Sequence, residues 1–168
     1  GQEGTKISWD MDFAVRNTDD IGKIFIADRK GQTALLERKE DKWIYNGKYP
    51  ARPTAVDLLL ETISKVNVEY IPPDISTESM VREIATIGIK VEIYDRKGKN
   101  MKTYYIGGIT GDHRGTVMIM EGSEKPYVVH IPSFVGQLRV RYMLGDEQWL
   151  DRTVFEEKPE EIQQISVE

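Results

Sequence analysis

The 168-residue sequence contains no cysteine, which excludes disulfide bridges, thiolate metal sites and cysteine nucleophiles. Basic charge is also scarce, since 23 Lys and Arg face 28 Asp and Glu, for a formal net charge of −5. Proteins that neutralise nucleic-acid phosphates normally carry an excess of Lys and Arg, so we expect no nucleic-acid partner. No apolar run is long enough to cross a bilayer, and no signal peptide is visible.

The residues that are present describe a globular chain, with 39% hydrophobic and 30% charged residues. Short apolar or alternating runs separated by polar turns predict strands at 24–27, 33–38, 43–45, 68–71, 90–94, 102–106, 116–120 and 127–131. Apolar residues at helical spacing predict helices that begin at Pro53 and near 76. We therefore expect an α+β fold, with mainly antiparallel strands in two small meanders and two intervening helices packed on one sheet face.

The ends of these elements have signals of their own. Gly88 is placed to adopt a left-handed conformation at the end of the second helix, which runs over 76–87. Residues 134–143 predict a short helix, and 149–155 predict an isolated packing segment.

The sequence also contains pairs of segments that are similar to each other. The strand and turn at 24–31 align with those at 91–98, because both end in Asp-Arg-Lys-Gly. Residues 160–167 echo 19–26 as well, so a further unit is expected to begin there. We expect a lead-in over 1–18, one α+β domain over 19–155 and, from the second echo, the start of a truncated unit over 156–168. Because the sequence begins at Gly1 without an initiator Met, an anchor before the lead-in is expected to have been removed. Within the domain, two smaller units, 19–71 and 88–132, are joined by the helix at 76–87.

Several stretches carry a family resemblance, including Trp-Ile-Tyr-Asn-Gly-Lys-Tyr-Pro-Ala-Arg-Pro over 43–53 and Thr-Tyr-Tyr-Ile-Gly-Gly over 103–108. The others lie at 12–15, 23–28, 58–63, 89–94, 120–123, 126–132 and 149–155. Through them the chain, from 9 to 155, resembles the uncharacterised bacterial family called domain of unknown function 4340.

The resemblance implies a periplasmic, extracytoplasmic protein, held to the inner membrane by an N-terminal helix outside this sequence. Some relatives neighbour or fuse to components of ABC-type export and gliding systems, which implies an accessory role and a protein partner in the cell envelope. The family brings no established active site, so the resemblance transfers no catalytic residue and no cofactor.

The glycine-rich stretch 107–115 is the first candidate site. A phosphate cradle leads into a helix N-terminus, but this stretch leads into the strand predicted at 116–120, so a wide hairpin loop is the better interpretation. Such a loop can still form a contact surface. The predicted interaction surface is Gly107, Gly108, Asp112, His113, Arg114 and Tyr104.

Catalysis and metal binding have weaker support. His113 and Asp112 are spaced like a base and its orienter, but Ser123 and Ser133 do not lie in a nucleophile-elbow pattern. His130 is expected to be a partly buried strand residue. Two His residues without cysteine match no zinc spacing, and the acids at 10, 12, 19 and 20 are expected to be a solvated segment.

The resemblance, together with the weak support for catalysis, implies a non-enzymatic binding or assembly module of a membrane-anchored envelope protein, accessory to an ABC-type transporter. A domain that binds a glycan or a peptidoglycan fragment is the alternative, using the 107–115 loop and exposed tyrosines. A hydrolase is the third. An aromatic-lined cleft would favour the glycan binder. A His that meets carboxylates in a pocket would favour the hydrolase. An unpaired sheet edge would favour the assembly role.

Overall fold

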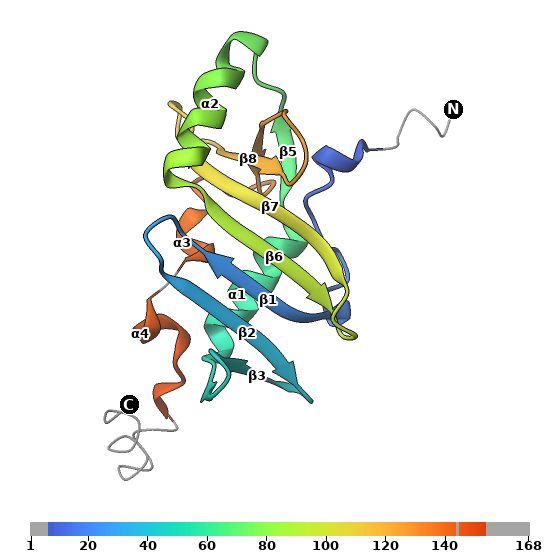
Figure 1. The fold of residues 1–168 in the computed structure, drawn as a ribbon, viewed down its shortest axis with the longest axis vertical. Helices are drawn as coiled ribbons and strands as arrows, with labels where there is room; N and C mark the ends of the chain where they lie inside the picture. The colour runs from blue at the N-terminus through green and yellow to red at the C-terminus, as the bar shows by residue number, and fades with distance from the viewer. Residues whose placement is uncertain (1–6, 144, 154–168) are drawn as a thin grey trace.

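The computed structural model describes residues 7–143 and 145–153, which form an α+β fold around one antiparallel sheet (Figure 1). Nine strands among the described residues have the order β4-β3-β2-β1-β6-β7-β8-β9-β5. The strands are β1 Ile21–Ala27, β2 Thr33–Lys39, β3 Lys42–Tyr45, β4 Tyr49–Pro50, β5 Asn67–Tyr70, β6 Ile89–Asp95, β7 Asn100–Ile109, β8 Thr116–Met120 and β9 Tyr127–His130. The helices are η2 Trp9–Met11, η3 Thr18–Asp20, α1 Pro53–Lys65, α2 Asp74–Ile87, α3 Arg139–Tyr142 and α4 Asp146–Trp149.

The predicted α+β class is confirmed, and the strands form one continuous sheet. β1 to β4 pair in chain order, and so do β6 to β9, while β1 pairs with β6 and joins the two runs. β5 is added at the far end, antiparallel to β9. Among the described residues, β4 and β5 are therefore the two edges of the sheet.

The two Asp-Arg-Lys-Gly turns have the same hydrogen bonds. Asp28 Oδ1 accepts from the backbone N–H of residues 30 and 32, and Asp95 Oδ1 accepts from those of residues 97 and 99, all at 2.9 Å. Gly31 and Gly98 have φ values of 88° and 89°, a left-handed conformation that glycine adopts without strain. The internal repeat as a whole stays a prediction, and the further unit predicted to begin at 160–167 lies outside the described residues.

The two long helices cover opposite faces of the sheet, so the expectation that they pack on one face is wrong. Met118 and Met120 of β8 join the main core with the apolar face of α1, whereas Val117 and Ile119 pack with Ile84 of α2. Successive strand residues point to opposite faces, so α1 and α2 lie on different sides. In Figure 1, α1 runs behind the sheet and α2 covers its upper end.

Gly88 also differs from its prediction. Its φ of −61° and ψ of 144° are extended rather than left-handed, because the chain enters β6 at the next residue. A glycine is needed there for space, since a Cβ would lie 2.3 Å from the carbonyl oxygen of Ile84.

The segments at the two ends of the described chain complete the main core. Phe13 is buried against Tyr104, with ring centroids 5.7 Å apart at 86°. Trp149 is fully buried and stacks on Tyr45, with centroids 6.3 Å apart. The predicted helix at 134–143 is shorter than expected, because α3 covers only its last part.

Candidate functional site

The predicted 107–115 loop is shorter than expected, because β7 continues to Ile109 and the β7–β8 hairpin loop covers only 110–115. Half of the predicted interaction surface is buried. Gly107 and Gly108 lie under α2, where added Cβ atoms would approach Ile84 Cγ1 to 2.8 Å and Glu83 Oε1 to 2.9 Å. Their lack of a side chain lets the helix pack closely. These two glycines therefore serve α2 packing and are not accessible to a partner.

Tyr104 is the third buried member, because it lies in β7 on the core side of the sheet and is 0% exposed. Its hydroxyl is 2.9 Å from that of Tyr142, and the two rings meet edge to face. Burial, and then the neighbouring Tyr142, raises the pKa of Tyr104 well above 10. The two neutral, hydrogen-bonded tyrosines connect the sheet to α3, and we call them the tyrosine pair.

The tyrosine pair predicts that the stability losses of two substitutions are not additive. Tyr104→Phe leaves the buried hydroxyl of Tyr142 without its partner, which costs about 1–3 kcal/mol of unfolding free energy. The double variant Tyr104→Phe/Tyr142→Phe removes both hydroxyls, so it is expected to be no less stable than the single variant. Urea unfolding measures both, with Tyr105→Phe as the neighbouring half-buried control. If the double variant lost as much unfolding free energy as the sum of the two single variants, the predicted coupling of the tyrosine pair would be contradicted.

Asp112, His113 and Arg114 are the exposed members of the predicted surface. Hydrogen bonds from the hydroxyl of Thr110 and the N–H of Arg114 hold the pKa of Asp112 below its ordinary value. His113 has a φ of 61°, which places this residue in the left-handed region. The carboxylate of Asp112 also contributes to the raised pKa of Tyr70, after burial, so the loop faces the end of β5.

The structure does not bring together the residues that were considered for catalysis. Ser123 follows β8 whereas His113 precedes it, so the two stand at opposite ends of the strand. Among the described residues, no hydrogen bond joins Asp112 or Ser133 to His113, and no group of three or more His, Asp or Glu side chains forms a metal-binding cluster. His130 ends β9 and is half-buried, as expected.

Ser123 has a different partner. Asp10 Oδ2 accepts from its hydroxyl at 2.9 Å, and Asp10 Oδ1 accepts from Ser8 at 2.8 Å and from Tyr127 at 3.4 Å. Asp10 is only 8% exposed, so the prediction of a solvated acidic segment is wrong at this residue. Burial alone would raise the pKa of Asp10, but these three hydrogen bonds outweigh it and lower the pKa.

The lowered pKa predicts a pH-dependent effect at Asp10. The stabilisation is present above the ordinary Asp value of 3.8 and is lost as the pH falls through the lower folded-state pKa. Asp10→Asn should therefore cost about 1–3 kcal/mol at pH 7, and less well below pH 3.8. Urea unfolding at both pH values measures the difference, with the exposed Glu124→Gln as control. An equal loss at both pH values would show that the charge of Asp10 contributes nothing.

The edge strand β5 is a feature that the sequence prediction of a site missed. A groove of about 440 Å³ runs along it, lined by Ile7, Met11 and residues 67–71, and we call this the edge groove. Ile71 is 65% exposed, and Tyr70 is exposed as well. No backbone hydrogen bond joins residues 7–16 to β5 in the described part of the chain, so the outer edge of the strand has no paired strand there, although Ile7 and Met11 form the other wall of the groove.

A signal for this edge is present in the sequence. Pro72 and Pro73 follow directly after Ile71. Proline has no N–H to donate to a ladder, so a short strand that ends in two prolines is typical of a sheet edge.

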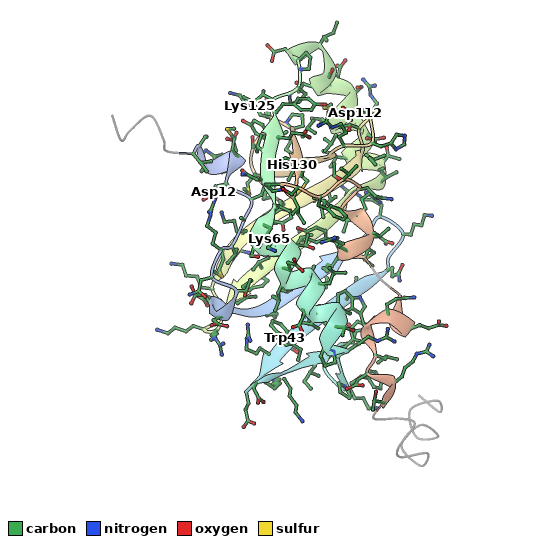
Figure 2. The ribbon with its side chains drawn as sticks, turned by 180° about the vertical axis from the view of Figure 1, so that it is seen from behind. Asp12, Trp43, Lys65, Asp112, Lys125 and His130 are labelled. Carbon is green, nitrogen blue, oxygen red and sulfur yellow. The ribbon has the colours of Figure 1, made fainter. Side chains whose placement is uncertain are left out.

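A second hollow of about 560 Å³ lies between α1 and β3, at the other end of the sheet from β5. It contains one aromatic side chain, that of Trp43, together with several carboxylates. Figure 2 shows Trp43 beside the lower part of α1, away from His130 and Asp112 in the upper half. None of the residues of the predicted interaction surface lines it.

A family model described as "Domain of unknown function (DUF4340)" matches residues 46–168. That range includes β5 and the β7–β8 loop. No curated protein and no solved structure was found to match the chain. No helix among the described residues is both long and apolar enough to span a bilayer.

Proposed function

The chain belongs to the family described as "Domain of unknown function (DUF4340)", and from this premise we propose that it is a binding and assembly module that pairs β5 with an extended segment of a partner protein. The observation that carries the proposal is the open edge of β5 beside an apolar groove. An unpaired edge offers backbone donors and acceptors to an added strand, and a neighbouring groove selects its side chains.

The side chains at this edge suit such a partner. Ile71 and Tyr70 are large and exposed, and burying side chains of this size contributes about 1.5–3 kcal/mol each. Each backbone hydrogen bond of an added strand contributes about 0.5–1.5 kcal/mol net. The partner segment therefore needs β propensity and apolar side chains, and it needs no fixed charge.

The location and the identity of the partner rest on the family resemblance. We place the module in the periplasm, held to the inner membrane by a helix N-terminal to this sequence. The partner is then an envelope protein, and a subunit of an ABC-type transporter is the first candidate. The module itself carries out no chemistry in this proposal.

The glycan-binding alternative has less support from the aromatic side chains. Tyr104 and Tyr45 are buried in the core, and Tyr105, whose hydroxyl donates a hydrogen bond to Glu121, lines neither of the two hollows. The hydrolase would require His113 or His130 to meet carboxylates in a pocket, and neither His lines either of the two hollows described above.

The proposal predicts that a charge at the edge abolishes partner binding. Ile71→Lys, in the full-length membrane-anchored protein, places a charged side chain in the edge groove, directly after the last residue of β5. Partner recovery after gentle solubilisation and affinity purification should fall about tenfold or more, because an apolar anchor of about 2 kcal/mol is lost. Quantitative mass spectrometry measures the recovery.

Ile75→Lys is the matched control, because Ile75 lies four residues further along in α2 and is 92% exposed. Both substitutions change an exposed isoleucine, so both variants should fold. Equal partner recovery from the two variants and from the unchanged protein would overturn the edge as the binding surface.

A further inference from the structure

The hollow between α1 and β3 is a built groove, and we call it the helix groove. One wall is a single face of α1 that carries Pro53, Asp57, Leu60 and Ser64, at helical spacing. The opposite wall is the start of β3, including the half-buried Trp43. Its volume of about 560 Å³ is within the range of small-ligand pockets, roughly 300–1,000 Å³.

The charge of the helix groove is unbalanced. Its lining contains two cations, Arg38 and Lys42. The carboxylates that line it are Asp19, Asp41, Asp57, Glu61 and Asp151. Carboxylates thus outnumber cations, and the groove wall attracts a positively charged ligand.

Arg38 is already held by the protein. Its guanidinium donates to the carbonyl oxygens of Ile21 at 2.8 Å and Thr18 at 2.9 Å, and it lies 4.6 Å from the centre of the Trp43 ring. Glu61 is paired with Lys65 at 2.9 Å. Asp41 and Asp57 are exposed and form no ion pair within the described part of the chain. These two carboxylates are therefore open to a ligand.

We propose that the helix groove binds a polypeptide segment that carries Lys or Arg side chains. Such a side chain combines an apolar stem with a cationic head. The stem would pack on Trp43 and Leu60, and the head would meet the carboxylates of Asp41 and Asp57. This occupant follows from charge complementarity together with the apolar part of the wall, because a small metal ion would leave the apolar part unused.

The helix groove is independent of the edge groove. The two share no lining residue, and they lie at β3 and at β5, toward opposite ends of the sheet. The loss of either activity would leave the other unaffected, so the two proposals fail separately.

The experiment uses the whole 168-residue chain labelled with 5-fluorotryptophan, which gives one fluorine signal for each of its three Trp residues. Trp43→Phe identifies the signal of Trp43. The probe is acetyl-Lys-Ala-Lys-amide, and acetyl-Gln-Ala-Gln-amide is the uncharged control. We expect a saturable shift at Trp43 with the lysine peptide, no shift at Trp9 or Trp149, and no response to the glutamine peptide.

Two double variants test which carboxylates bind the lysine peptide. Asp41→Asn/Asp57→Asn should weaken binding of the lysine peptide about fivefold at low salt, since two exposed charge pairs are lost. Asp74→Asn/Glu78→Gln removes two exposed acids from α2 and should leave the affinity unchanged. Absence of a saturable shift at Trp43, an equal response to the glutamine peptide, or equal weakening by the two double variants would overturn the proposal.

Discussion

Trp149→Ala is expected to lower the unfolding free energy by about 3–5 kcal/mol, a large part of the stability of a domain of this size. Trp149 is fully buried and stacks on Tyr45, and the backbone N–H of Arg52 donates to its carbonyl oxygen at 2.6 Å. Ala51 and Leu150 also form an antiparallel bridge. Truncation leaves a cavity where α4 meets β3 and β4, so urea unfolding should show a strongly reduced midpoint.

Trp149→Phe separates packing from hydrogen bonding in the same place. Trp149 Nε1 is buried and has no hydrogen-bond partner among the described residues. Phenylalanine keeps an aromatic ring beside Tyr45 and removes the unsatisfied donor, so we expect a loss well below that of the alanine variant. If both variants lose the same stability, the stacked ring is not the source of the effect.

Phe13→Ala is the second large effect, and about 3–5 kcal/mol is expected again. Phe13 precedes the sheet in sequence, but its ring packs edge to face on Tyr104 and also on Tyr127, with a centroid distance of 6.4 Å to the latter. The N–H of Val15 donates to the carbonyl oxygen of Ile63, which fixes the segment against α1.

The control for Phe13 is Ile7→Ala, which truncates an exposed residue of the same segment. Its effect on unfolding should be within about 0.5 kcal/mol, as for most surface substitutions. Comparable losses from the two variants would show that residues before β1 stabilise the fold by something other than the buried Phe13 ring.

The local elements were predictable because the signals that define them are local. Alternating residues predicted the strands, and Pro53 marked the first residue of α1. The Asp-Arg-Lys-Gly sequence predicted both turns, whose hydrogen bonds connect residues only two and four positions apart. Nothing beyond neighbouring residues is needed for these features.

The arrangement of the elements was not predictable in the same way. The pairing of β1 with β6 joins residues about 70 positions apart, such as Ile24 and Ile93, and no local pattern specifies it. The apolar stripe of α2 indicated a buried side but not which sheet face it would cover. Tyr104 was assigned to a surface although it shares a strand face with the apolar Ile106, and that parity was a usable signal.

The most direct test of the edge-strand proposal is photo-crosslinking in living cells. A photoreactive amino acid replaces Ile71 in one full-length protein and Ile75 in another, since both positions are exposed. The proposal predicts a crosslink to one envelope protein from position 71, at a defined segment of that partner, and no such product from position 75. Crosslinks from position 75 alone, or none from position 71 in cells where the partner complex is intact, would contradict the role of β5.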